Sequence, residues 1–279
     1  MINAKPMVIG VIALALLAWT GALHAEEATA PADNNVDTEA GNVGGMCGGI
    51  AVEDTGAVVN SVTGWVVDAS CWLGLGARGE KHQQCAVACA NMGTPLVILT
   101  DRGTVIYPVM LTAPASPKEN NAKLIPFAEQ RVTVTGRVIK RGQERGIVID
   151  TVATAPEPEK PVSFAGRETA NVQLVARVSD LSCWIGKGEH GTNHAECAQA
   201  CAQAGEPLVL VNDSGYIYYP VTQTMPSGPA DNARLMNYCE QEVQVTGKII
   251  QRGRERAVVI DKVAAYAPMP KPGSTGSGK

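Results

Sequence analysis

Residues 131–153 read RVTVTGRVIKRGQERGIVIDTVA, and residues 242–264 read EVQVTGKIIQRGRERAVVIDKVA. In each stretch two runs rich in valine and isoleucine flank a polar centre, which is the pattern of a β-hairpin. The V-x-V-x-G sequence places Gly136 and Gly247 inside the first strand of each hairpin. A glycine at such a position marks a sharp bend of the kind that a small barrel requires. The chain therefore carries the same barrel-type hairpin twice.

The repetition extends beyond the hairpin, over roughly ninety residues with a single deletion. PLVIL at 95–99 matches PLVLV at 207–211, and DRGTVIYPV at 101–109 matches DSGYIYYPV at 213–221. Self-similarity over this length predicts two copies of one domain.

Each copy contains the elements of a small barrel in the order strand, helix, hairpin, short helix, hairpin. Val62–Asp68 alternates as a strand does, and the alanine-rich segment from His82 to Met92 suits a helix. Five short strands with a helix before the last hairpin are the plan of an OB-type barrel. We predict a mainly β protein with short helices (α+β), a tandem duplication of an OB-like five-stranded barrel, each with an inserted Cys/His helix. A small open sheet with one helix packed across it is the alternative.

The segments outside the repeats have the composition of a leader, linkers and a tail. A charged start, a short apolar run and a small-residue exit indicate a signal peptide. The apolar run is too short for a comfortable membrane span, so we expect no stable span after cleavage; a retained anchor is the alternative. The predicted localisation is periplasmic or secreted. The assignments are 1–25 signal peptide, 26–55 flexible acidic linker, 56–155 first repeat, 156–171 Pro-rich linker, 172–267 second repeat and 268–279 flexible tail.

A second repeated motif carries the candidate chemistry. Residues 71–90 read CWLGLGARGEKHQQCAVACA, and residues 183–202 read CWIGKGEHGTNHAECAQACA. On a helix the histidine and the two following cysteines fall within a sector of roughly 60°. A glycine-rich loop lets the first cysteine, at the end of the strand, reach the same face. Three thiolates and one imidazole match a four-coordinate metal site. The predicted ligands are Cys71, His82, Cys85 and Cys89 in the first copy, and Cys183, His194, Cys197 and Cys201 in the second.

Disulfide bonds are the ordinary alternative for cysteines of an exported protein. An odd number of motif cysteines in each copy cannot all pair internally, and a disulfide framework does not need the repeated histidine. The C-x3-C spacing also differs from the C-x2-C spacing of thiol oxidoreductases. Cys47 and Cys239 have no counterpart in the other copy. We expect them to pair with each other, or each within a repeat, and not to bind metal.

The identity of the metal is open between zinc and copper, since both accept thiolate and imidazole ligands. Asp68 and Asp180 precede the first motif cysteine by three residues. Two roles are open for them, either holding the second ring nitrogen of the histidine or capping the loop that follows. Trp72 and Trp184 are expected to cover the site with apolar surface.

The run D-x2-C-W…H-x2-C-A-x2-C-A…V-T-G resembles a largely uncharacterised family of OB-fold-like domains in exported bacterial proteins. The resemblance covers both repeats and includes the inserted cysteine and histidine residues. It implies an OB-like fold and an exported setting, and it implies no activity.

Three classes of function follow: a metal-binding or metal-carrying protein, a disulfide-stapled module of a larger envelope protein complex, and a thiol-redox protein. Nucleic-acid binding is not expected, because the net charge is −4 and only 4% of the residues are aromatic. The chain has no G-x-S-x-G, H-E-x2-H or phosphate-binding loop motif. We therefore do not expect an enzyme.

Overall fold

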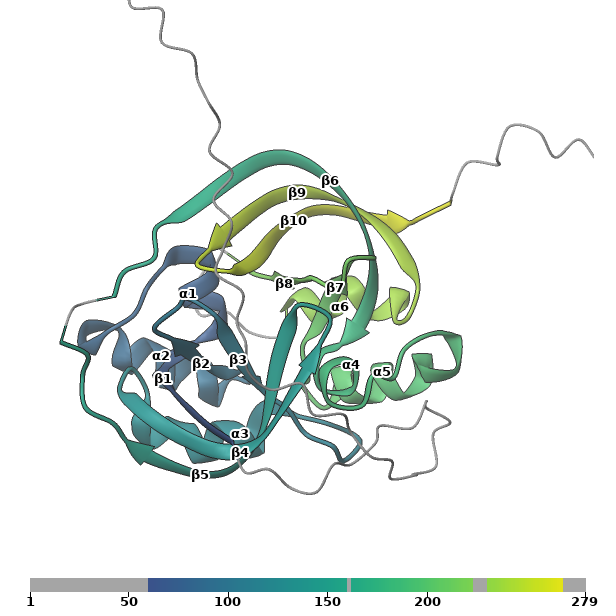
Figure 1. Cartoon of the computed structure of the whole chain (residues 1–279). Coiled ribbons are helices and arrows are strands. Elements are labelled where there is room, and N and C mark those ends of the chain that lie inside the picture. The colour runs from purple at the N-terminus through teal and green to yellow at the C-terminus, as the bar shows by residue number, and fades with distance from the viewer. Residues whose placement is uncertain (1–59, 160–161, 223–229, 268–279) are drawn as a thin grey trace, which may run out of the picture. The chain divides into compact units, whose positions relative to one another are not determined.

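The strands of the chain close into two barrels of five strands each (Figure 1). The computed structural model describes residues 60–159, 162–222 and 230–267. The first barrel consists of β1 (Asn60–Asp68), β2 (Leu96–Thr100), β3 (Val105–Pro108), β4 (Arg131–Arg141) and β5 (Glu144–Thr154). The second consists of β6 (Gly166–Asp180), β7 (Leu208–Val211), β8 (Ile217–Pro220), β9 (Glu242–Arg252) and β10 (Glu255–Ala265). The mainly β architecture predicted from the sequence is confirmed.

Both barrels have the same strand order. β1 lies between β2 and β4, β2 pairs with β3, β3 runs parallel to β5, and β5 pairs with β4 and so closes the barrel. In the second barrel β6, β7, β8, β10 and β9 follow in the same order, and β8 runs parallel to β10. The described strands form closed barrels and not the open sheet that was the alternative.

Short helices lie at equivalent points of the two barrels. The first barrel has α1 (Ala69–Leu75), the 3-10 helix η1 (Glu80–His82), α2 (Gln83–Asn91), α3 (Pro117–Leu124) and the 3-10 helix η2 (Ile125–Phe127). The second barrel has α4 (Leu181–Lys187), η3 (Thr192–His194), α5 (Ala195–Gln203), α6 (Ala230–Leu235) and η4 (Met236–Tyr238). The helix predicted from His82 to Met92 corresponds to α2, and the histidine belongs to the separate 3-10 turn before it.

Helices α1 and α4 replace the start of the glycine-rich loop that was expected directly after the first strand. Oδ1 of Asp68 accepts a hydrogen bond from the backbone nitrogen of Cys71 at 2.7 Å, and Asp180 caps α4 in the same way at 2.9 Å. Each helix ends at a glycine in the left-handed region, Gly76 (φ 71°) or Gly188 (φ 74°). A helix of seven residues that contains glycine has too little periodicity to be distinguished from a loop.

The predicted bend at Gly136 and Gly247 coincides with a bulge in the last hairpin. The register between β4 and β5 shifts at Thr135/Gly136, and that between β9 and β10 shifts opposite Gly247. A Cβ atom at Gly136 would lie 2.0 Å from the carbonyl oxygen of Val148, and one at Gly247 would lie 2.1 Å from that of Val259. Only glycine allows the two strands to approach so closely.

Strand β6 begins inside the segment predicted as the linker. The sequence predicts a linker over residues 156–171, but β6 starts at Gly166 and pairs there with Arg252 of β9. The ladder continues across a bulge between Thr169 and Val172. The strand starts early because β9 extends far enough to supply hydrogen-bonding partners for these residues.

Several predictions lie outside the described residues, namely the signal peptide (1–25), the acidic linker (26–55), Cys47 and the tail (268–279). The chain divides into Met1–Asp37 and Thr38–Lys279, and all the described residues belong to the second unit. No helix among the described residues is long and apolar enough to cross a membrane.

Two buried glutamates join the barrels reciprocally. Glu255 of β10 accepts a hydrogen bond from the backbone nitrogen of Val105 in β3 at 2.8 Å. Glu144 of β5 accepts one from the backbone nitrogen of Ile217 in β8 at 2.9 Å. Both side chains are shielded from water, with 4% and 5% of their surface exposed. Burial raises the pKa of both carboxyl groups, and the charge of Glu144 raises that of Glu255 further.

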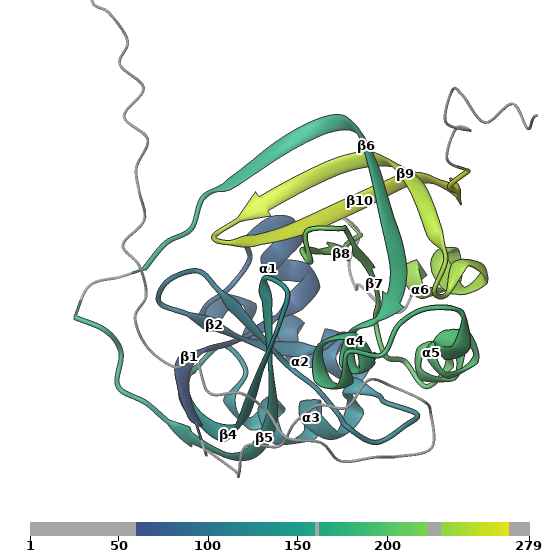
Figure 2. The ribbon, with the colours of Figure 1, turned by 45° about the vertical axis from the view of Figure 1, so that its right-hand side comes forward.

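The helices that carry the first motif cysteines pack on the opposite barrel. Helix α1 lies against β9 and β10, and α4 lies against β4 and β5 (Figure 1, Figure 2). Trp72 and Trp184, which were expected to cover the metal site, belong to a hydrophobic core that both barrels build. Trp72 meets Phe164 edge to face, with ring centroids 6.4 Å apart. Each barrel also keeps a hydrophobic core of its own.

The buried glutamate pair predicts a loss of stability in alkali. A carboxyl group whose pKa is raised by folding stabilises the protein at low pH, and this contribution disappears as the pH rises through the folded-state pKa. We expect Glu255→Gln to keep its hydrogen bond to Val105 and to reduce the loss of unfolding free energy between about pH 6 and about pH 9 by on the order of 1–3 kcal/mol. Urea denaturation at both pH values measures this difference.

The exposed Glu119→Gln is the control for removal of one negative charge, and it should follow the parent protein. A Glu255→Gln variant with the same pH dependence as the parent would show that the pair does not titrate in this range.

Candidate metal centres

The first cysteine of each motif is positioned by the start of a helix. Cys71 and Cys183 are the third residues of α1 and α4, and not strand ends as expected. The capping carboxylates of Asp68 and Asp180 bind the backbone nitrogens of these cysteines. Of the two roles left open for the aspartates, the helix cap is therefore observed. The sulfur positions follow from the caps, and both cysteines are fully buried.

The other two cysteines of each motif lie on one side of the next helix. Cys85 and Cys89 belong to α2, and Cys197 and Cys201 belong to α5. A separation of four residues places two side chains on the same helical face. The second cysteine of each pair is fully buried and the first is partly exposed.

A glutamate with a left-handed backbone orients each histidine. Glu129 and Glu240 both have φ of 61°. Nδ1 of His82 lies 2.8 Å from Oε1 of Glu129, and Nδ1 of His194 lies 2.9 Å from Oε1 of Glu240. The other carboxylate oxygen accepts a hydrogen bond from the glycine three residues before the histidine, at 2.6 Å and 2.7 Å. Metal-binding histidines usually have their second nitrogen held by a carboxylate in this way.

Three sulfur atoms come together in the first barrel. The Sγ atoms of Cys71, Cys85 and Cys89 lie within 4.8 Å of one another. His82 is not a member of this group. A tetrahedral zinc ion with bonds of about 2.3 Å places its sulfur ligands about 3.8 Å apart. The spacing of the three sulfurs is therefore close to that of a metal-thiolate site.

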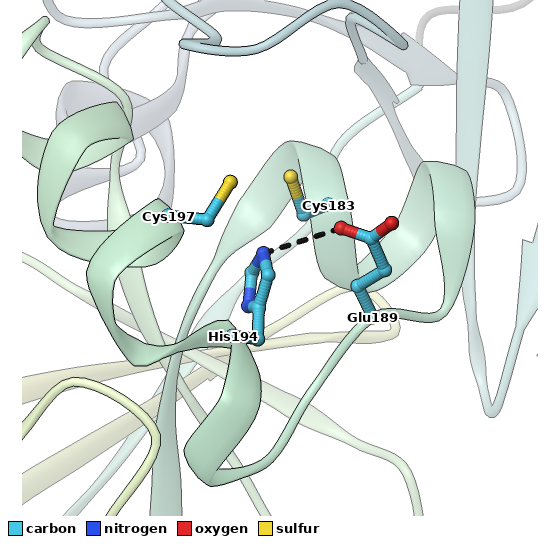
Figure 3. A group of neighbouring side chains, drawn as sticks. All are labelled: Cys183, Glu189, His194 and Cys197. Atoms are coloured by element: carbon cyan, nitrogen blue, oxygen red, sulfur yellow. Dashed lines mark ion pairs between the residues drawn. The ribbon is translucent and has the colours of Figure 1, made fainter. Parts of the chain in front are cut away.

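A mixed group forms in the second barrel. Ligand atoms of Cys183, Glu189, His194 and Cys197 lie within 4.8 Å of one another (Figure 3). Nε2 of His194 is 3.5 Å from Oε2 of Glu189, and it points toward the two sulfur atoms (Figure 3). This group offers two sulfurs, one nitrogen and one oxygen to a single ion.

Cys201 belongs to a second group that overlaps the first, together with Asp180 and Cys183. Its sulfur accepts a hydrogen bond from the backbone nitrogen of Ala115, a residue before α3 of the first barrel, at 3.3 Å. The hydrogen bond with Cys183 lowers the pKa of Cys201 to about 7. The same bond, together with burial, raises the pKa of Cys183.

Buried polar atoms without hydrogen bonds concentrate at the two centres. The described residues contain nine such side-chain atoms, of which five are Nε2 of His82 and His194, Oδ2 of Asp68 and Asp180, and Oε2 of Glu189. An unpaired buried polar group costs about 1–3 kcal/mol. A cation held among thiolates would satisfy the nitrogen and carboxylate atoms together. The residues present therefore fit a metal ion.

The surroundings of His194 attract positive charge. Burial disfavours the imidazolium, but the hydrogen bond to Glu240 and the charges of Asp180, Glu240 and Glu189 raise the pKa of His194 overall. Asp180 Oδ2 and Glu189 Oε2 each lie 3.5 Å from Nε2 of the ring. Either a proton on the ring or a metal ion at Nε2 would neutralise part of this negative charge.

Seven of the eight predicted ligands belong to the groups at the two centres and His82 does not, so the residues do not form two equal Cys3His groups. The first barrel gathers its three cysteines, whereas the second gathers two cysteines with a histidine and a glutamate. The seven described cysteines form no disulfide bond with one another. Cys239 is buried after η4, where burial raises its thiol pKa to about 12. Its expected partner, Cys47, lies outside the described residues.

Three residues of the centres were not identified from the sequence. Glu129 and Glu240 stand in an E-Q pair directly before the fourth strand of each copy, and this repeat was the available signal. Glu189 corresponds to Ala77 in the first copy. Nothing in the repeat marks Glu189 as a ligand.

Comparison with protein-family models, with curated proteins and with solved structures found no match to the chain.

The histidine–glutamate pairs can be tested by removing their charge. Glu129→Gln and Glu240→Gln keep an oxygen that accepts from Nδ1, but the neutral amide makes the imidazole a weaker ligand. We expect each variant to lower zinc affinity at its own centre about 10–100-fold. Competition with a chromophoric zinc chelator measures the change.

Glu119→Gln, on the exposed side of α3, is the matched control. Unchanged zinc affinity in both variants would remove the proposed link between these glutamates and the metal.

Proposed function

We propose that the protein binds one metal ion in each barrel through the cysteines and histidine of the repeated motif. The ligands would be drawn from Cys71, His82, Cys85 and Cys89 in the first barrel, and from Cys183, His194, Cys197 and Cys201, joined by Glu189, in the second. The observation that best supports metal binding is the arrangement of the two histidines. In each barrel Nδ1 is held by a glutamate, and the buried Nε2 has no hydrogen-bond partner.

The placement of the ligands supports a structural or storage role more than fast exchange of the ion. Closed sites with several protein ligands are typical of structural metals. Here four of the six motif cysteines are fully buried: Cys71, Cys89, Cys183 and Cys201. A bound ion would tie the short helix after the first strand to the longer helix that follows it, and so stabilise the whole insertion.

We also propose the setting of this function. Equal strand order and repeated sequence support two copies of one OB-like domain, in line with the resemblance to exported OB-fold-like domains. The composition of residues 1–25 supports export to the periplasm or the medium. A larger envelope protein complex is the partner that we propose for such a module. Zinc or copper is the proposed metal.

A thiol-redox function is the second candidate, and one observation favours it. The hydrogen bond with Cys183 lowers the pKa of Cys201 to about 7, so Cys201 ionises more readily than an ordinary thiol. Reactive thiolates also need access to their substrates. Cys183 and Cys201 are 0% exposed, which makes this candidate the weaker one.

Metal content tests the proposed function directly. Mature protein purified without chelator should contain two metal ions per chain by elemental analysis. His82→Ala and His194→Ala should each lose about one equivalent, because each removes one ligand from one centre. His190→Ala is the matched control, since His190 is exposed and its ring bonds only the carbonyl oxygen of Gly188.

Alkylation distinguishes the candidates. A metal-thiolate site should protect the six motif cysteines until a chelator is added, and chelation should also lower the melting temperature. No metal above background, together with disulfide-linked peptides containing Cys71 or Cys183, would refute metal binding.

A further inference from the structure

The two centres differ in the ligands they bring together, and we propose that they select different metals. The first barrel would take a soft monovalent ion, Cu(I), and the second a divalent ion of intermediate softness, Zn(II). This inference rests on the proposed function, because it assigns an ion to each of the two metal sites.

The first centre is a sulfur centre. Its group consists of the thiols of Cys71, Cys85 and Cys89, and His82 lies outside it. The position that corresponds to Glu189 is Ala77, which offers no ligand atom. Thiolate ligands favour soft ions, among which Cu(I) is stable with sulfur ligands alone.

The second centre contains a harder ligand. Oε2 of Glu189 is buried, has no hydrogen-bond partner and faces Nε2 of His194 at 3.5 Å (Figure 3). With Cys183 and Cys197 the set becomes two sulfurs, one nitrogen and one oxygen. Zinc binds cysteine, histidine and carboxylate ligands in tetrahedral sites, whereas a carboxylate oxygen is a poor ligand for Cu(I).

A compensating substitution accompanies Glu189. Lys187, which corresponds to Leu75 of the first barrel, places its Nζ 4.0 Å from Oε2 of Glu189. Relative to the first barrel, the second centre gains one positive side chain, Lys187, and one negative side chain, Glu189. Its ligand chemistry changes, but these two differences leave its net charge unchanged. Lys187 is partly exposed, and an ammonium at this distance can turn toward water when an ion binds Glu189.

A mixed-metal titration tests the assignment. Apoprotein of the full mature chain is offered excess Cu(I) and Zn(II) together without oxygen, then desalted and analysed for both elements. We expect one copper and one zinc per chain. X-ray absorption should show mainly sulfur around copper, and fewer sulfurs together with nitrogen and oxygen around zinc.

Two variants swap the residues that distinguish the centres, one in each direction. Glu189→Ala should lower the zinc affinity of the second centre about tenfold or more and leave copper at the first unchanged. Ala77→Glu should raise zinc occupancy of the first centre at the expense of copper. The near-native melting temperature of both variants would show that they fold, and a variant that does not fold is replaced by Glu189→Gln or Ala77→Gln.

The outcomes distinguish a failure of the metal assignment from a failure of metal binding itself. Two ions of the same element from the mixture, or equal first shells around both metals, would overturn the assignment and leave metal binding intact. Unchanged zinc affinity in Glu189→Ala would also overturn it. Protein that binds neither metal would refute the proposed function and this inference together.

Discussion

The reciprocal hydrogen bonds of Glu144 and Glu255 are the constraint on which the arrangement of the barrels depends. Each carboxyl group accepts a hydrogen bond from a backbone nitrogen in the third strand of the other barrel. A buried backbone nitrogen needs a partner, and here a glutamate of the other barrel supplies one. The stacked rings of Tyr107 and Tyr219, 6.4 Å apart, lie in the same core that both barrels share. Separation of the barrels would expose this core and leave both nitrogens without their glutamates.

The same junction reaches the two candidate metal centres through the short helices α1 and α4. Cys71 and Trp72 are neighbours in the chain, yet one belongs to a thiol cluster and the other to the core between the barrels. Cys183 and Trp184 are divided in the same way. Because a seven-residue helix moves as one body, the position of the sulfur and the packing of the tryptophan are mechanically linked. The bond from Ala115 to Cys201 adds a direct contact from the first barrel to the second centre.

The sequence was most informative where one residue type satisfies a local need. Gly136 could be assigned to a bend because a strand glycine marks such sites, and the strands could be placed by their alternation. Contacts between distant segments left no such mark. Glu129 lies 47 residues beyond His82, and a glutamate before a strand looks like an ordinary surface residue. Glu144 belongs to a charged hairpin tip, which normally faces water. Here Glu144 is buried because it bonds to the second barrel, although Gly142 and Gln143 beside it are exposed. A single copy of the repeat cannot reveal that partner.

The polar groups around the thiols bear on the choice between a metal and a disulfide. A disulfide would consume two sulfurs and still leave the buried Nε2 of His82 without a hydrogen bond, whereas Nε2 of His194 would keep its ion pairs with Asp180 and Glu189. An unpaired buried polar atom costs about as much as one hydrogen bond contributes, so a buried imidazole nitrogen without a hydrogen bond favours a compensating interaction. A cation bound by the sulfurs and the imidazole provides one, because it also lowers the energy of the nearby carboxylates. A metal would account for the histidines and acids of the motif together, whereas a disulfide staple requires neither.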